Sequence, residues 1–105
     1  MSNADTEDAL SAAAKKAFAA PFDAVLKIAP DNAPPLWVDG RQDPPQLLAT
    51  APDNAADDCL WRGARDALIR AMGSARSFES AYVSGRVAVS GDISVMARLK
   101  LAEVR

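Results

Sequence analysis

Apolar residues recur at helical spacing near the start of the chain. Positions 10, 13, 14, 17 and 18 are apolar and form one stripe, because residues three or four positions apart lie on the same side of a helix. Acidic residues occupy the first turn, and Lys15 and Lys16 lie near the end, the order that the helix dipole favours. The pattern predicts a helix over residues 5–19 that stops before Pro21.

The next segments alternate between apolar and polar residues, as half-buried strands do. Apolar residues at 22, 24, 26 and 28 predict a first strand, and residues 36–38 predict a second. Asp39-Gly40 is a favoured two-residue hairpin turn, and we expect a return strand around residues 46–50. Pro44 and Pro45 cannot donate ladder hydrogen bonds, so this strand belongs at a sheet edge. Residues 58–62 predict a fourth strand.

A second helix is predicted over residues 64–72. Leu68, Ile69 and Met72 would face inward, and Gly73 would end the helix as a left-handed cap. We expect a short polar link with one helical turn at residues 77–80 before the last strand.

The stretch YVSGRVAVSGD, residues 82–92, predicts that last strand. Val83, Gly85, Val87 and Val89 share one face. Gly85 puts no side chain on this face, which would let a helix or a ligand approach the sheet; a β-bulge at Gly85 explains it equally well.

A final helix should follow the strand. Gly91 permits a sharp change of direction, and Asp92 is a good N-cap. Its inward stripe would consist of Val95, Met96, Leu99 and Ala102. The order of elements is α-β-β-β-β-α-β-α, which predicts an α+β fold: a five-stranded, largely antiparallel sheet covered on one face by helices.

Length and composition indicate one domain over residues 1–105. Half of the residues are apolar and a quarter are charged, an ordinary globular balance. No apolar run is long enough to span a membrane, the N-terminus is polar and acidic, and the single Cys59 excludes an internal disulfide. We therefore expect a cytoplasmic protein.

The charge is distributed unevenly along the chain. Residues 1–58 carry ten acids and four bases, a net of −6, whereas residues 59–105 carry four acids and eight bases, a net of +4. The basic half could face an anionic head group, or the two halves could lie together and neutralise each other. Nucleic-acid binding is not expected, because aromatic residues are not interleaved with the arginines at positions 62, 65, 70, 76 and 86.

Most catalytic chemistry is excluded by the residues present. The chain has no histidine, hence no imidazole metal site and no Ser-His-Asp or Cys-His arrangement, and it has no glycine-rich phosphate loop. Cys59 fits a small core residue. Asp57 and Asp58 are adjacent strand residues that point to opposite faces, so they cannot easily share a proton. We expect neither enzymatic activity nor a cofactor or metal.

The chain from Gly73 onward resembles the sterol carrier protein 2 (SCP2) family. Domains of that family end in a glycine-capped helix, a linker, a strand of the form A-F-x-x-G-x-L-x-I-x-G-D/N and a closing helix. The matching positions here are Ala81, Tyr82, Gly85, Val87, Val89, Gly91 and Asp92. The earlier elements follow the same order. The chain departs from the family at Gly63, at Pro44-Pro45 and in its short last helix, which could leave one end of a cavity more open or leave too little cover to form one.

The resemblance implies an apolar tunnel between sheet and helices for a fatty acyl chain, acyl-CoA or sterol. The side chains that would form its wall are Phe18, Phe22, Leu26, Leu68, Met72, Val87, Met96 and Leu99. Gly73, Gly85 and Gly91 would be structural glycines. The same side chains would form the core of any α+β domain, and that alternative leads to an accessory module with a filled core that binds a partner protein. The expected partners are thus a lipid and a lipid-handling enzyme, with transient contact to a membrane surface.

Overall fold

The computed structural model describes residues 2–52 and 58–99. The elements, in chain order, are α1 (Ser2–Ala17), β1 (Val25–Pro30), β2 (Leu36–Asp39), β3 (Gln46–Leu48), β4 (Cys59–Gly63), α2 (Arg65–Ala71), α3 (Ala75–Val83), β5 (Val87–Gly91) and α4 (Ser94–Arg98). The predicted strands are all present, and one helix more than predicted.

The five strands form one mixed sheet in the order β3-β2-β1-β4-β5. The pairs β1–β2, β2–β3 and β4–β5 are antiparallel, and β1 and β4 run parallel at its centre. The predicted α+β class with a largely antiparallel sheet is confirmed, and β3, which follows the proline pair, lies at the edge as expected.

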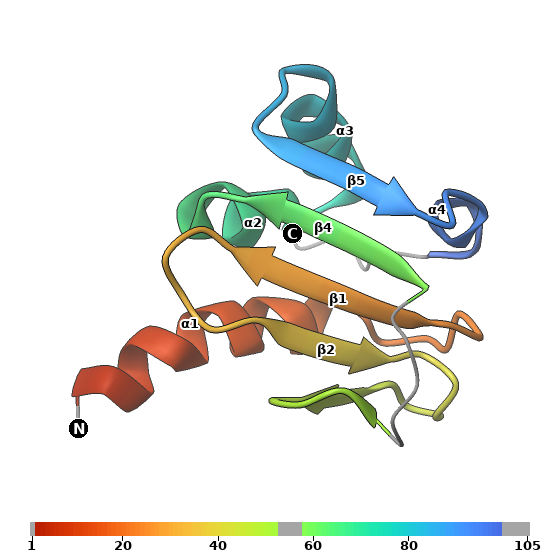
Figure 1. Cartoon of the computed structure of the whole chain (residues 1–105), viewed down its shortest axis with the longest axis horizontal. Coiled ribbons are helices and arrows are strands. Elements are labelled where there is room, and N and C mark those ends of the chain that lie inside the picture. The colour runs from red at the N-terminus through yellow and green to blue at the C-terminus, as the bar shows by residue number, and fades with distance from the viewer. Residues whose placement is uncertain (1, 53–57, 100–105) are drawn as a thin grey trace.

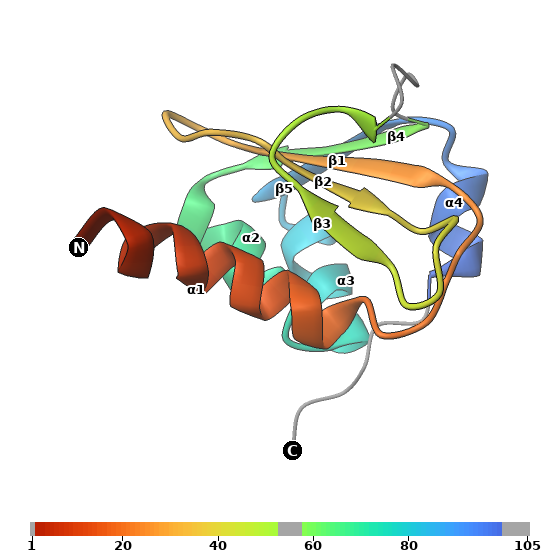
Figure 2. The same cartoon turned by 90° about the horizontal axis from the view of Figure 1, so that it is seen from below.

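Helices α1, α2 and α3 lie on one face of the sheet (Figure 2), and α4 lies at one end of it, after β5 (Figure 1). The apolar stripe of α1 is buried against the sheet: Leu10, Ala14, Ala17 and Phe18 each expose 6% or less. Apolar side chains of the central strands meet this stripe, so the core lies between the two layers.

The predicted two-residue turn at Asp39-Gly40 is wrong, because residues 40–45 separate β2 from β3. Gly40 is bound to the chain before β1. Its carbonyl accepts hydrogen bonds from the backbone N–H groups of Phe22 and Asp23, and its own N–H donates to Ala24. Asp39 is buried and paired with Arg41 at 2.8 Å. Asp39 and Gly40 therefore do not form the turn of a hairpin; Gly40 joins the end of β2 to the segment before β1, and Asp39 is paired with Arg41.

The expected polar link with one helical turn at residues 77–80 is only partly right, since residues 75–83 form a complete helix, α3. Ser74 caps the helix by accepting a hydrogen bond from the Ser77 N–H at 3.0 Å. At the other end, the N–H of Gly85 donates to Tyr82 and that of Arg86 to Ala81, the paired hydrogen bonds of a Schellman motif. Gly85 has a φ of +82° and belongs to this cap.

Two expectations about strand β5 consequently fail. Val83 is in the helix and 77% exposed, so it shares no strand face with Val87. A Cβ at Gly85 would meet no atom within 4 Å, so this glycine does not serve the close approach of a helix or ligand. Its role is the left-handed backbone that ends α3.

Of the other two structural glycines, one behaves as predicted. Gly91 has a φ of +88°, and a Cβ there would lie 2.7 Å from the Asp58 carbonyl oxygen. Gly73 has no positive φ, so it is not a left-handed cap; α2 ends at Ala71 with Met72 as its C-cap. The Asp92 carboxylate accepts hydrogen bonds from the backbone N–H and from the hydroxyl of Ser94, and these hydrogen bonds lower the pKa of Asp92.

Candidate apolar ligand site

The predicted tunnel wall lies mostly inside the packed core. Six of the eight side chains expose 4% or less of their surface and join one apolar cluster: Phe18, Phe22, Leu26, Leu68, Met72 and Val87. Met96 and Leu99 are partly buried and pack against the edge of that cluster. The structure therefore brings the eight together, and leaves Met96 with an open side.

Met96 lines an apolar groove between α3, β5 and α4. The groove has a volume of about 570 Å³, within the range of small-molecule sites. Its lining residues are Ala75, Arg76, Phe78, Glu79, Tyr82, Val89, Ile93 and Met96. Six of these eight side chains are apolar or aromatic, and the two charged ones come from α3.

The floor of the groove is continuous with the core through Trp61. The indole of Trp61 is fully buried and lies 4.5 Å, centroid to centroid, from the ring of Phe78. Its Nε1–H donates to the Met96 sulfur at 3.3 Å. On its other side Trp61 contacts Phe18, with ring centroids 5.7 Å apart. Trp61 therefore contacts both Phe78 and Met96, two of the residues that line the groove.

The walls of the groove are more exposed than its floor. Tyr82 is 50% exposed and Ile93 is 52% exposed, unusually high for large apolar side chains. Phe78 and Tyr82 lie four residues apart on α3, and their rings stack nearly parallel with centroids 6.2 Å apart. The arrangement presents flat and branched apolar surfaces to a ligand.

The groove was missed in the sequence because α3 was missed. The sequence pattern predicts a polar link with one helical turn at residues 77–80 and a strand from residue 82, whereas residues 75–83 form one helix. The signals that could have identified the helix are Ser74 as N-cap, the i,i+4 pair Phe78 and Tyr82, and Gly85 as the residue after the C-cap.

Two of the three residues considered for catalysis, Asp58 and Cys59, lie within the described residues. Cys59 is buried, and the Asp58 carboxylate accepts a hydrogen bond from the backbone N–H of Val25 at 2.8 Å. Asp57 lies outside the described residues. Within residues 2–52 and 58–99, no group of three or more acidic or cysteine side chains is placed to hold a metal ion.

No protein-family model and no curated protein matches the sequence. Solved structures do match the fold. A structure described as "UbiJ-SCP2 Ubiquinone synthesis protein" has a TM-score of 0.56 and 20% identity, and covers 86% of this chain and 73% of its own. The solution structure of the "sterol carrier protein domain 2 of Helicoverpa armigera" has a TM-score of 0.57 and 9% identity, with coverages of 90% and 69%. Apo sterol carrier protein 2 from Yarrowia lipolytica has a TM-score of 0.53 and 14% identity, with coverages of 89% and 72%.

These likenesses define the architecture. The α+β domain described above has the SCP2 fold, as the strand at residues 87–91 and its flanking glycines indicated. At 20% identity and below, the likeness concerns the fold alone. The part of the chain that the structure describes has no helix long and apolar enough to cross a membrane.

Proposed function

We propose that this domain is a non-enzymatic lipid carrier that holds the apolar part of a fatty acyl, acyl-CoA or sterol-like ligand in the groove between α3, β5 and α4. The observation that carries the proposal is the groove itself, which has a volume of about 570 Å³ and a mainly apolar lining. Two of its lining side chains, Tyr82 and Ile93, are half exposed. An exposed apolar concavity of this kind is typical of ligand sites.

The energetics of the groove suit an alkyl chain. Each methylene removed from water contributes about 0.8 kcal/mol, so binding needs an apolar slot more than specific polar contacts. Met96 is unbranched and adaptable, which suits a flexible ligand. Arg76 and Glu79 lie at the same groove and offer polar partners for the end of the ligand.

The proposal moves the ligand from the interlayer tunnel to the edge of the core. Phe18, Leu26 and Met72 are buried in the core, whereas the α3–α4 side still presents apolar surface in a groove. Of the eight predicted wall residues, Met96 lines this groove, and the other seven lie in the core cluster or pack against it.

The test is a titration of delipidated protein with a fluorescent long-chain fatty acid. We expect saturable binding at one site per chain, and we expect Met96→Trp to abolish it by filling the groove. Ile93→Glu provides a second variant, because it places a charge on the wall without touching the core. Val83→Trp is the matched control: Val83 is 77% exposed and does not line the groove. Equal binding by all four folded proteins would remove the groove as the lipid site.

The second candidate is an accessory module that binds a partner protein. The filled core favours it, as do the exposed apolar side chains of Tyr82, Val83 and Ile93. In that case the folded wild-type protein binds no fatty acid probe, and substitution of these three residues affects a protein complex instead.

A further inference from the structure

A second, larger hollow of about 940 Å³ lies on the opposite face of α3. Residues 77, 80 and 81 of α3 line it, whereas residues 75, 78, 79 and 82 line the apolar groove, and helical periodicity places these two sets on opposite sides. Arg76 lies between the two sets and lines both hollows. The two concavities therefore meet at the first turn of α3.

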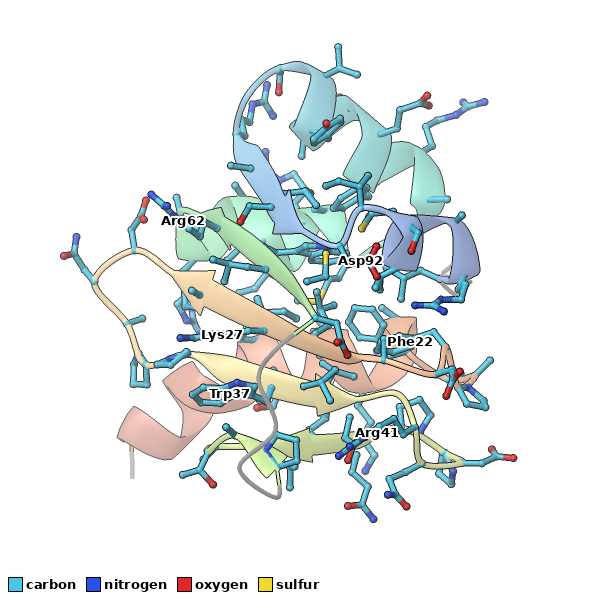
Figure 3. All side chains as sticks on the ribbon, turned by 45° about the vertical axis from the view of Figure 1, so that its right-hand side comes forward. Phe22, Lys27, Trp37, Arg41, Arg62 and Asp92 are labelled. Atoms are coloured by element: carbon cyan, nitrogen blue, oxygen red, sulfur yellow. The ribbon has the colours of Figure 1, made fainter. Side chains whose placement is uncertain are left out.

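Four arginines from four different parts of the fold line the larger hollow. Arg62 comes from β4, Arg70 from α2, Arg76 from α3 and Arg86 from the turn before β5. Figure 3 shows Arg62 near the end of β4 that lies away from Asp92. These are four of the five arginines that the sequence pattern singled out, brought together by the packing of α2, α3 and β5.

These guanidinium groups have no partners within the described residues. Within residues 2–52 and 58–99, none of these four side chains forms a hydrogen bond or an ion pair. The acidic partner in the Arg41–Asp39 ion pair is therefore not shared with them. Asp31 and Asp66 also line the hollow, so its lining carries four positive and two negative charges. Positive charge is left uncompensated in a concave surface, where the field of several cations adds.

From this arrangement we infer that the arginine hollow binds a phosphate-bearing group. Guanidinium groups present planar pairs of N–H donors that match phosphate oxygens, and their hydrogen bonds to phosphate are charge-assisted. The phosphate could belong to the head group of a lipid whose tail occupies the apolar groove, an arrangement that rests on the proposed function, or to a free phosphate compound. Arg76 is the residue that would contact both parts of such a lipid.

Three probes separate these sources by isothermal titration calorimetry at low ionic strength: inorganic diphosphate, oleate and 1-oleoyl lysophosphatidate. The variant is the double substitution Arg70→Gln/Arg86→Gln, in two exposed arginines that do not line the apolar groove. The matched control is Lys15→Gln/Arg98→Gln, which removes the same charge from exposed residues outside both hollows.

We expect the arginine variant to bind the phosphate-bearing probes about tenfold more weakly than the wild type, and the control to stay within about twofold. Oleate should bind all three proteins alike. A loss confined to lysophosphatidate identifies a lipid head group, and a loss that includes diphosphate identifies a site for free phosphate compounds. Added salt should reduce the affinity for both phosphate probes, because the contacts are solvent-exposed.

Equal effects of the two double substitutions would overturn the inference, because the hollow would then act only through net charge. The two proposals fail separately. If the wild type binds oleate as tightly as lysophosphatidate and does not bind diphosphate, the arginine site is rejected and the proposed lipid site in the apolar groove is not affected. Diphosphate binding that depends on Arg70 and Arg86, in a protein that binds no oleate, supports the arginine site and rejects the lipid carrier.

Discussion

The interlayer core and the α3–α4 groove are built from the same kinds of side chain, yet one is sealed and the other is open. Leu26 and Leu68 are fully buried between the sheet and the helices, whereas Tyr82 and Ile93 are half exposed. The difference lies in the cover. Helices α1 and α2 lie over the centre of the sheet, while the five-residue α4 lies only at its end (Figures 1 and 2).

Trp61 joins the two regions and shows what separates a core from a ligand site. One side of its ring contacts Phe18 in the core, and the other contacts Phe78 at the floor of the groove. Apolar character is common to both neighbours. Phe18 and Phe78 differ in whether another helix covers the side chain, and this depends on the lengths and positions of the helices.

The largest expected effect tests the sealed side. Leu68→Ala should lower the free energy of unfolding by about 2–5 kcal/mol, because a fully buried leucine leaves a cavity that its neighbours only partly fill. Urea unfolding monitored by circular dichroism measures the change. Ile69→Ala, on the same helix at a partly buried position, is the control and should cost less. A loss below about 1 kcal/mol at Leu68 would indicate empty space beside it and would favour the interlayer tunnel.

The two glycines with positive φ sharpen the comparison at the level of the backbone. Gly91→Ala combines a disfavoured φ with a Cβ 2.7 Å from the Asp58 carbonyl oxygen, so we expect a loss of about 2–3 kcal/mol. Gly85→Ala adds only the φ penalty, since space is open around it, and should cost about 1 kcal/mol. Thermal unfolding of both variants measures the difference. Equal losses would mean that the carbonyl near Gly91 moves away without cost.

Acid should weaken the sealed side through Asp39. Its carboxylate is buried, and hydrogen bonds from the Arg41 side chain, together with the Arg41 backbone N–H and charge, lower the pKa of Asp39 below its ordinary 3.8, although burial opposes them. A lowered folded-state pKa stabilises the fold above the unfolded-state value, and this stability is lost as the pH falls through the folded-state pKa.

The corresponding measurement is the unfolding free energy of the wild type and of Asp39→Asn between neutral pH and the folded-state pKa. At neutral pH the variant should be less stable by about 1–2 kcal/mol, because the charged hydrogen bonds to Arg41 are lost. The difference in unfolding free energy between the two proteins should decrease in acid, because protonation of Asp39 also removes its charged hydrogen bonds to Arg41. A difference in unfolding free energy that does not change with pH would show that the charge of Asp39 does not contribute to stability.

The sequence predicted the sheet well because strand signals are local. The alternation from Phe22 to Ile28 predicted a strand, although β1 begins only at Val25, and the proline pair predicted that β3 lies at the edge of the sheet. Both signals can be recognised without reference to other parts of the chain. The SCP2 fold followed from the strand and glycines of residues 81–92 and from the order of elements. Burial of Leu68 and Met72 followed from helical periodicity.

The open groove could not be predicted, because it depends on where elements end. Val83 lies four residues before β5 and continues its period-two alternation backwards through Gly85, so a strand fitted the segment as well as the helix that forms. Ser74, the pair Phe78 and Tyr82, and Gly85 favour the helix, and the hydrogen bonds from the N–H groups of Gly85 and Arg86 back to α3 show that the helix forms. The sequence indicated a short last helix and with it a more open end of a cavity, but which of the eight apolar side chains faces that opening depends on where α3 and α4 lie relative to the sheet.

The smallest expected change in stability tests the open side. Ile93→Ser should alter the free energy of unfolding by less than about 0.5 kcal/mol, because Ile93 is already half exposed. The same substitution should weaken fatty acid binding about tenfold, since a ligand in the groove buries that side chain in the complex. Val83→Ser, on the exposed side of α3 outside the groove, should change neither quantity. Unaltered binding by Ile93→Ser would assign Ile93 to a protein contact instead, and a large loss of stability would place Ile93 with the sealed core.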